Sequence, residues 1–352
     1  MPSAFELHGS FTEPGLADDA AAGAERIGLT GLLARRGHRA RRVRVPGAAA
    51  VEGFRWRLVD IFTQTWWPQG IAVGTHEGVP VAITSWYAQP KGGREMGARV
   101  SVVDLRDPRR PRYHHVLLVA PRRTADGTAF DPVVVHAGGI VWSGDRLLVA
   151  ATGGGFREFR LSGILSLPAR GLLGRGLRRG SGPFGYRYVL PEFGTFAPPK
   201  TKDPKLRYSF IALHNDDDAG ELLLVSGEYS KKGEPRLAQL RLYDQHAAVD
   251  QTHVPGIAEM QGAVLADDTW FVNASRGDKL GGDLWVGAPD AMVRHEHVLP
   301  PGPEDMALWP ERRQIWSVTE FPGKRWVYAI ALDRYAPPAA PLAPANRAAP
   351  PG

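Results

Sequence analysis

The chain contains no cysteine, which excludes disulfide bonds, thiolate catalysis and cysteine-ligated metal sites. It also lacks any run of about 18 consecutive apolar residues, so the sequence predicts no membrane-spanning helix. The short motifs of common enzyme classes, such as the P-loop, G-x-S-x-G and H-E-x-x-H, are missing as well. Function therefore has to be inferred from how the remaining residues are arranged.

The N-terminal segment lacks the features of an export signal. Glu6, Glu13, Asp18 and Asp19 make it acidic and polar, and no basic stretch precedes an apolar one. A secretory signal peptide has a positively charged stretch followed by an apolar one. We expect a cytoplasmic protein, with secretion as the alternative for a processed chain.

The excess of positive charge is small and concentrated in two runs. The chain has 43 Lys+Arg against 37 Asp+Glu, a formal charge of +6. The runs comprise Arg35, Arg36, Arg39, Arg41 and Arg42, and then Arg175, Arg178 and Arg179. Neither run is interleaved with aromatics at a base-stacking spacing. We expect solvated surfaces, a monomer, and neither nucleic acid nor a membrane as a partner.

Turn-forming residues are abundant. Gly (41) and Pro (30) are frequent among the 352 residues, 43% of the chain is apolar and only 23% is charged. This balance is typical of many short strands joined by turns around a substantial core. This composition argues against an all-helical bundle.

A pattern of short strands recurs five times. One end of each unit is a β-rich run that closes at Pro46, Pro121, Pro191, Pro255 or Pro300. An apolar run follows each of them, starting at Pro68, Ala137, Tyr208, Met260 or Glu304. A turn, a second apolar run and a third strand come next, the third strands including residues 99–105, 236–242 and 326–332. Four antiparallel strands per unit predict an all-β fold, a five-bladed β-propeller.

The strand count also predicts how the ring closes. The last unit has three strands, whereas an orphan strand, Arg42–Pro46, precedes the first unit. Pairing of this N-terminal strand with residues 326–332 of the last blade would remove the exposed edges. We expect a largely irregular arm over 1–40, a propeller domain over 41–335 with an insertion at 162–185, and a Pro/Ala-rich tail over 336–352. A β-sandwich or two small β domains are the alternatives.

Polar residues concentrate at one end of the inner strands, which predicts a site at one mouth of the central channel. The catalytic candidates are Glu304, Asp305, Glu259 and His136. Neighbouring strand residues point to opposite faces, so only one of Glu304 and Asp305 should face the channel. Together with Glu259 it could separate acid and base roles. The alternative is a structural ion pair with Arg207 or Arg276.

Aromatic and amide side chains at the same end are candidates for substrate binding. They are Trp66, Trp67, Gln69, Trp86, Tyr87, Arg207, Tyr208 and Gln261. The indoles suit a flat apolar molecule or a sugar face, although aromatic packing between blades is the alternative. His114, His115, His295 and His297 fall in outer strands, where we expect them to face solvent.

The blade layout resembles the five-bladed propeller clan of arabinanases and fructan-cleaving hydrolases. That resemblance implies one mouth carboxylate from each of three early-to-middle blades. Gln69 stands where those enzymes carry a base Asp, and unit two offers His136, so their carboxylate set does not carry over. The polar mouth is also similar to that of propeller lactonases, lyases and cyclases, which act with or without calcium. The Ala/Arg/Gly/Pro-rich composition looks like that of actinobacterial proteins, where such enzymes occur in secondary metabolism.

These observations predict a small-molecule enzyme that acts at the channel mouth without an organic cofactor. The expected reaction type is an acid/base lyase, cyclase or hydrolase, and calcium is the one ion left open. A propeller that binds a ligand or protein without turnover is the first alternative. A glycoside hydrolase, which needs two flanking carboxylates, is the second.

Overall fold

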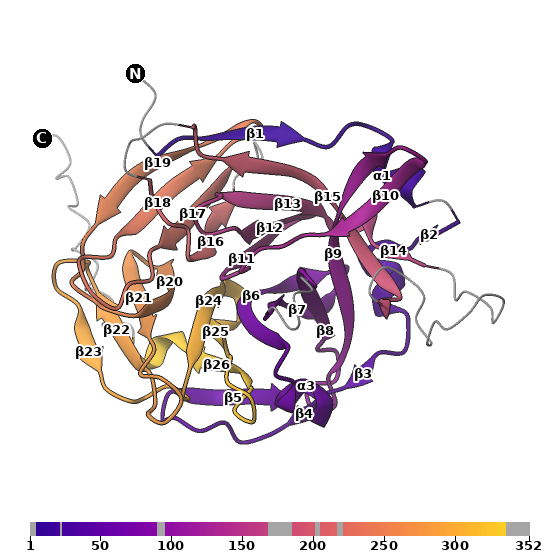
Figure 1. Cartoon of the computed structure of the whole chain (residues 1–352). Helices are drawn as coiled ribbons and strands as arrows, with labels where there is room; N and C mark the ends of the chain where they lie inside the picture. The colour runs from indigo at the N-terminus through magenta and orange to yellow at the C-terminus, as the bar shows by residue number, and fades with distance from the viewer. Residues whose placement is uncertain are drawn as a thin grey trace, which may run out of the picture.

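The computed structural model describes residues 5–21, 23–89, 96–167, 185–200, 205–216 and 221–335. Its strands form five antiparallel four-stranded units around a common centre (Figure 1). The first unit contains β6 (Trp66–His76), β7 (Val79–Ala88), β8 (Ala98–Asp104) and β9 (Arg112–Thr124). The second contains β11 (Ile140–Ser143), β12 (Arg146–Ala150), β13 (Phe156–Arg160) and β15 (Tyr188–Ala197).

The remaining three units follow in chain order. The third contains β16 (Phe210–Asp216), β17 (Leu222–Gly227), β18 (Leu237–Leu242) and β19 (His246–His253). The fourth contains β20 (Met260–Ala266), β21 (Thr269–Ala274), β22 (Asp283–Gly287) and β23 (Val293–His295). The last contains β24 (Pro303–Trp309), β25 (Gln314–Thr319), β26 (Val327–Ala331) and, from the N-terminal part of the chain, β5 (Ala50–Arg55).

The core lies between the units and closes into a ring. The innermost strands β6, β11, β16, β20 and β24 contact one another in this order, and β24 contacts β6 again. A hydrophobic cluster fills each interface: Val81 packs with Val149 between the first two units, and Trp86 packs with Val318 between the first and the last. The inner strands are covered on both faces, which explains their continuous apolar runs. The chain is a β-propeller, as the sequence predicts.

An N-terminal strand closes the last unit, although it is not the predicted one. β26 pairs with β5, with Tyr328 opposite Gly53 and Val327 opposite Phe54. The predicted segment Arg42–Pro46 lies outside it, where β4 (Arg41–Arg42) pairs with the outer edge of β5. The chain reverses at Gly47, whose φ of 95° is left-handed, and this turn brings the second arm of the hairpin onto β26.

Gly53 makes this closure possible because β5 and β26 approach closely there. A Cβ at Gly53 would lie 2.6 Å from the carbonyl oxygen of Val327 and 2.6 Å from Val45 Cγ2. We therefore predict that Gly53→Ala lowers the free energy of unfolding by about 1–3 kcal/mol. Gly153→Ala is the matched control, since a Cβ there meets nothing within 4 Å. Equal urea midpoints for the two variants would contradict the closure argument.

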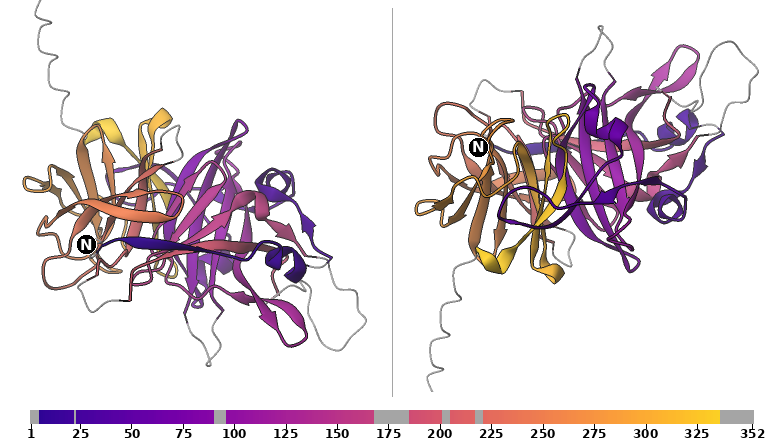
Figure 2. Two further views of the ribbon diagram at one scale, coloured as in Figure 1. Left: turned by 90° about the horizontal axis from the view of Figure 1, so that it is seen from above. Right: turned by 90° about the horizontal axis from the view of Figure 1, so that it is seen from below.

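The N-terminal arm is structured, in contrast to the irregular arm that we expected. It contains β1 (Leu7–Phe11), α1 (Leu16–Ala20), β2 (Glu25–Arg26), α2 (Gly28–Leu33) and β3 (His38–Arg39). β1 pairs with β15 and β19, and Figure 2 shows it running across the edge of both units. Leu29 and Leu32 of α2 join the cluster between the first two units. The short apolar runs of the arm thus dock onto the ring.

Other segments extend the units or connect them. β10 (Gly127–Pro132) pairs with β9, β14 (Leu165–Ser166) pairs with β15 and β2, and α3 (Leu58–Phe62) connects β5 to β6. Short 3-10 helices span Leu161–Gly163, Pro310–Arg312 and Leu332–Arg334. Most of the predicted insertion 162–185 and the whole tail 336–352 lie outside the described residues. None of the described helices has the length and apolarity needed to cross a bilayer.

Candidate functional site

Three innermost strands carry a β-bulge at the same end of the ring, which we call the mouth. The register shifts between Pro68 and Ile71 in β6, between Met260 and Gly262 in β20, and between Pro303 and Met306 in β24. A bulge re-aims the side chains of the extra residues. The residues in these bulges include Gln69, Gln261, Glu304 and Asp305, all predicted from the sequence as site residues.

Asp305 ties the innermost strands together. Its Oδ2 accepts the backbone N–H groups of Ile71 in β6 (3.1 Å) and Ile140 in β11 (3.2 Å). The side chain is 0% exposed, and Oδ1 has no partner among the described atoms. Burial raises the pKa of Asp305 well above its usual value, although the two N–H groups act in the opposite direction. Asp305 is thus a structural tie across the ring.

Glu304 forms a carboxyl pair with Glu320, which follows the second strand of the same unit. The two side chains share a hydrogen bond. Gln261 Nε2 donates to Glu304 Oε1 (3.1 Å). Gln69 Nε2 donates to Glu320 Oε2 (3.1 Å). Bulged residues of two other units therefore hold the pair from both sides.

The environment separates the pKa values of the two carboxyl groups. Burial, followed by the charges of Glu320 and Asp305, raises the pKa of Glu304 well above its usual value. Burial also raises the pKa of Glu320, but only to about 7, because Gln69, Glu304 and Arg325 stabilise its ionised form. The hydrogen bond between the two groups raises the pKa of Glu304 and lowers that of Glu320, which favours Glu304 as the protonated member of the pair. Two carboxyl groups with different proton affinity can act as an acid and a base.

Arg325 fixes the segment that carries Glu320. Its Nε donates to the backbone oxygen of Glu320 (2.7 Å), and its Nη1 donates to the backbone oxygen of Asp60 (2.8 Å). The guanidinium is buried and lies 5.7 Å from the ring centre of Trp67. Burial lowers its pKa to about 10, so it keeps its charge at neutral pH.

Several aromatic side chains lie at the mouth, and the charges of the carboxyl pair affect two of them, Tyr87 and Tyr229. The ring of Tyr87 lies 4.3 Å from that of the exposed His136. Burial and the charge of Glu320 raise the pKa of Tyr87 to about 12. Burial and the charges of Glu259, Glu304 and Glu320 raise the pKa of Tyr229. Trp67 is partly exposed beside Phe321, with ring centres 6.0 Å apart. The mouth is therefore aromatic and acidic.

Three of the predicted substrate contacts are buried in the core. Trp86 is 0% exposed between the first and last units, and Trp66 stacks on Arg99 at 4.5 Å. Tyr208 is 1% exposed and packs against Phe156. Their neighbours in sequence, Trp67, Tyr87 and Arg207, are partly or largely exposed. The packing alternative is correct for these three rings.

The predicted pairing of Glu259 with Glu304 or Asp305 is not what the structure shows, whereas the alternative, an ion pair with Arg276, is present at Glu259. Glu259 lies 3.8 Å from Arg276, which also binds Asp283 at 2.6 Å. Glu304 is paired with Glu320 instead of Glu259. The structure pairs neither Arg207 nor Arg276 with Glu304 or Asp305 among the described residues.

Two histidines that we expected in solvent belong to a buried polar network. His115 Nε2 lies 3.1 Å from Asp60 Oδ1, and its Nδ1 lies 2.8 Å from Ser101 Oγ. Tyr113 donates to Asp60 Oδ2 at 2.6 Å. His114 is also buried and contacts the backbone oxygen of Arg35 at 3.1 Å. The outer strand β9 is covered here by α3 and by the arm, which the strand pattern does not reveal.

Two residues of this candidate site, Glu320 and Arg325, are not among the catalytic and substrate-binding residues predicted above. Glu320 ends a second strand, but nothing in its local pattern distinguishes it from other polar strand ends. In the hairpin, Pro303 pairs with Thr319, and this register places Glu320 beside Glu304. The register depends on the bulge in β24, which the sequence does not predict. Arg325 lies in a loop of mixed composition, where no sequence signal marks a buried cation.

No metal cluster is found in the described part of the chain. A group of three or more His, Cys, Asp or Glu side chains placed to hold an ion does not occur there. The expectation of a reaction without an organic cofactor, with calcium left open, stays a prediction.

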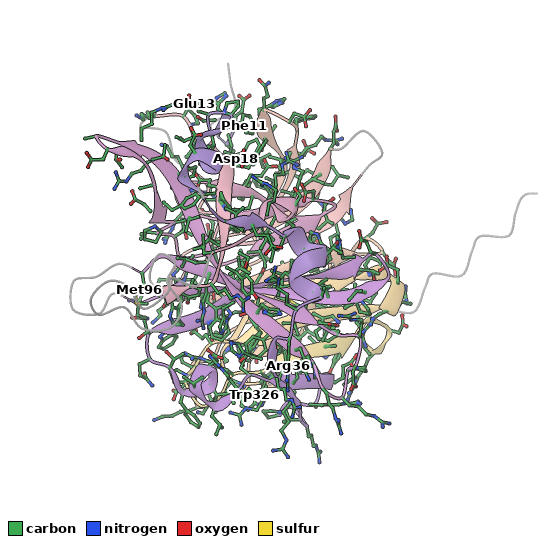
Figure 3. All side chains as sticks on the ribbon, turned by 90° about the vertical axis from the view of Figure 1, so that its right-hand side faces the viewer. Phe11, Glu13, Asp18, Arg36, Met96 and Trp326 are labelled. Atoms are coloured by element: carbon green, nitrogen blue, oxygen red, sulfur yellow. The ribbon has the colours of Figure 1, made fainter. Side chains whose placement is uncertain are left out.

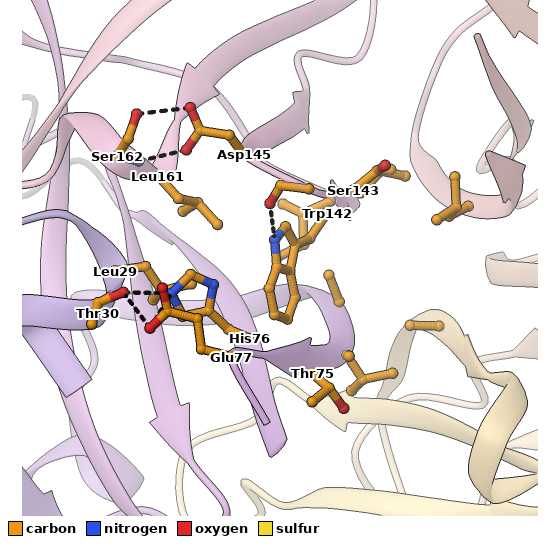
Figure 4. A pocket seen from close by; sticks show the side chains of 18 of the residues that line it. Leu29, Thr30, Thr75, His76, Glu77, Trp142, Ser143, Asp145, Leu161 and Ser162 are labelled. Atoms are coloured by element: carbon orange, nitrogen blue, oxygen red, sulfur yellow. Dashed lines mark hydrogen bonds and ion pairs between the residues drawn. The ribbon is translucent and has the colours of Figure 1, made fainter. Parts of the chain in front are cut away.

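A cavity of about 800 Å³ lies at the opposite end of the channel from the mouth. Its floor is formed by residues at the far ends of β6, β11, β16 and β24, such as Ala72 and Leu308, and α2 forms one wall. Figure 4 shows Trp142 and His76 among the side chains that line it, with Thr30 Oγ1 2.8 Å from His76 Nε2. This volume suits a small molecule.

Comparisons with known proteins identify no family. No family model matches the chain. No curated protein matches it either. Among solved structures, it is similar to a β-xylosidase/α-arabinofuranosidase from a compost microbial metagenome in complex with xylotriose, with 8% identity, 82% of this chain and 94% of that chain covered, and a TM-score of 0.39. A gluconolactonase from Xanthomonas campestris is 12% identical, with 84% and 89% covered and a TM-score of 0.32. The β-propeller domain of the trilobed protease from Pyrococcus furiosus is 8% identical, with 76% and 94% covered and a TM-score of 0.32.

Proposed function

We propose that the protein is a hydrolase that uses the Glu304/Glu320 pair to cleave an uncharged carbonyl compound, such as an ester or a lactone. The observation that carries this proposal is a hydrogen-bonded carboxyl pair held by Gln69 and Gln261, in which burial raises the pKa of Glu320 to about 7 and that of Glu304 well above its usual value. Such a pair holds an acid and a base together at neutral pH.

The chemistry follows from where the proton resides. Ionised Glu320 accepts a proton from a water that attacks the carbonyl carbon, while Glu304 donates its proton to the carbonyl oxygen. The tetrahedral intermediate then collapses: the bond to the leaving group breaks and the leaving group takes the proton from Glu320, while the C=O bond re-forms and its oxygen returns the proton to Glu304. Both carboxyl groups are then in their starting protonation states. Gln69 and Gln261 hold the two carboxyl groups during these steps. Trp67 and Tyr87 offer a flat surface for the substrate.

The geometry favours this reaction over cleavage of a glycosidic bond. Glycosidases place their two carboxyl groups about 5–9.5 Å apart, so that the sugar or a water fits between them. Here the two groups are in direct hydrogen-bond contact. A general acid/base lyase or cyclase could use the same pair, and those reactions are the outcomes to test next if hydrolysis is not found.

The pH profile tests the proposal. The pKa of Glu320 is raised to about 7, so the base is protonated below pH 6 and becomes ionised as the pH rises through 7. We predict that kcat/KM rises tenfold per pH unit below 7 and falls at alkaline pH, when Glu304 loses its proton. A panel of neutral esters, lactones and glycosides, assayed between pH 5 and 10, measures this. Turnover without an inflection near 7 would refute the assignment of the base.

Ligand binding without turnover is a second candidate function, which the cavity at the opposite end favours. Its volume of about 800 Å³ and its mixed polar and apolar lining fit a small molecule. A compound from the panel that binds without being converted would support this function. Its binding should then be weakened by Thr75→Trp, which narrows the cavity, and unaffected by Glu320→Gln.

A further inference from the structure

A strongly basic surface lies on the outer edge of the ring. We call it the arginine face and define it by Arg36, Arg39, Arg41, Arg42, Arg109 and Arg110, all of which are exposed. Within the described parts of the chain, none of these six guanidinium groups has an ion pair or a side-chain hydrogen bond. Arg36 is labelled at the lower edge of the view in Figure 3. The sequence predicted that the arginines between Arg35 and Arg42 form a solvated run. In the structure, the loop that carries Arg109 and Arg110 lies beside this run.

Backbone contacts bring these arginines together. The N–H of Ala40 donates to the carbonyl of Pro111 (2.9 Å), which joins the arm to the loop that carries Arg109 and Arg110. Arg39 stands opposite Arg112 in the pairing of β3 with β9, and Arg41 stands opposite Arg55 in the pairing of β4 with β5. Like charges placed opposite each other destabilise a sheet. An anionic partner would relieve that repulsion.

An exposed apolar helix adjoins the arginine face. α3 turns Asp60 and Ile61 inward and leaves Leu58, Val59 and Phe62 outward, at 73%, 59% and 59% exposure. Arg57, which precedes this helix, reaches His38 of β3 with its Nη1 3.1 Å from His38 Nδ1. Figure 1 places α3, β4 and β3 next to one another along the lower edge of the ring. The aliphatic and the cationic groups therefore share one edge.

We propose that this edge binds the surface of an anionic phospholipid bilayer. Arginines attract the phosphate groups of the headgroups, and neighbouring apolar side chains insert at the boundary with the acyl chains. A nucleic acid would use the same charges and could stack a base on Phe62, but it would leave the aliphatic side chains of Leu58 and Val59 without apolar contacts, whereas acyl chains bury all three. The combination favours lipid. This attachment differs from our sequence-based expectation of no membrane partner and is independent of the reaction at the mouth.

Sedimentation with lipid vesicles tests the proposal. The protein is mixed with vesicles of 30 mol% phosphatidylserine in phosphatidylcholine, or of phosphatidylcholine alone, at low and at high salt. We expect binding to the anionic vesicles only, and weaker binding at high salt because the charges are screened. Arg41→Gln combined with Arg42→Gln should weaken binding about 25-fold, since each arginine near an anionic membrane contributes about fivefold.

Two further variants make the result specific. Leu58→Ser combined with Phe62→Ser should weaken vesicle binding at least about tenfold through lost apolar insertion, without a change in charge. Lys231→Gln combined with Lys232→Gln removes two exposed charges outside this edge and should leave binding unchanged. Thermal melts verify that each variant is folded. Absence of binding to anionic vesicles at low salt, or binding to a DNA or RNA oligonucleotide without binding to vesicles, would overturn the proposal.

Discussion

Replacing Glu320 by glutamine is expected to lower kcat by about 10²–10⁴-fold and to leave KM nearly unchanged. An amide keeps the size of the side chain and can still bond to Gln69 and Glu304, but it cannot accept a proton from water. The pKa of the native carboxyl is about 7, so it is the group of the pair that is ionised at neutral pH. Steady-state kinetics with any substrate found in the panel measures the effect.

Two other glutamates make this measurement decisive. Burial also raises the pKa of Glu192. This carboxyl group lies outside the mouth and forms an ion pair with Arg157, with 2.7 Å between Oε2 and Nη1. Glu192→Gln should leave kcat unchanged. Glu259 is the carboxylate that the sequence favoured, and Glu259→Gln distinguishes the two assignments. Loss of turnover in Glu259→Gln with retained turnover in Glu320→Gln would show that the base is Glu259.

The ring could be predicted because it rests on repetition. Each inner strand must be apolar on both faces, and this requirement repeats five times in the sequence. The missing fourth strand of the last unit likewise predicted closure by an N-terminal strand. The strand that closes it, β5, could not be chosen correctly, because both arms of the hairpin around Gly47 contain apolar residues. Only the close approach at Gly53 distinguishes them.

The candidate site could be predicted in part. The predictions that placed Trp66 and Trp86 at the mouth are wrong because strand alternation was not applied to them. Alternation along a strand places Trp67 and Tyr87 on one face and Trp66 and Trp86 on the other, so only one member of each doublet can line the mouth. The same alternation led us to expect only one of Glu304 and Asp305 in the channel, and it applies equally to the two aromatic doublets. At Glu304 and Asp305 the bulge in β24 then altered the alternation, so that both lie near the axis.

Replacing Asp60 by asparagine is expected to have the largest effect on stability, a loss of about 3–5 kcal/mol. Asp60 is 4% exposed and accepts from Arg57, Arg99, Tyr113 and His115. These donors, with His115 first, hold the pKa of Asp60 well below its usual value against the effect of burial. An amide presents an N–H₂ group to one pair of donors and leaves the buried Arg99 without a counter-charge. The melting temperature should fall by about 6 °C or more.

A carboxylate in an exposed pair is the matched control for this variant. Asp131 binds Arg122, and both side chains are about half exposed, so Asp131→Asn should cost less than about 1 kcal/mol. The lowered pKa of Asp60 also determines how stability depends on pH. The ionised carboxylate stabilises the folded state above the pKa of an unfolded aspartate, and this stabilisation is lost as the pH falls further. The stability difference between wild type and Asp60→Asn should therefore shrink in acid.

Because Arg325 links the backbone of Asp60 to that of Glu320, the Asp60→Asn variant should also lower kcat at temperatures where it remains folded. A variant with unchanged stability and unchanged turnover would show that the network neither supports the fold nor positions Glu320.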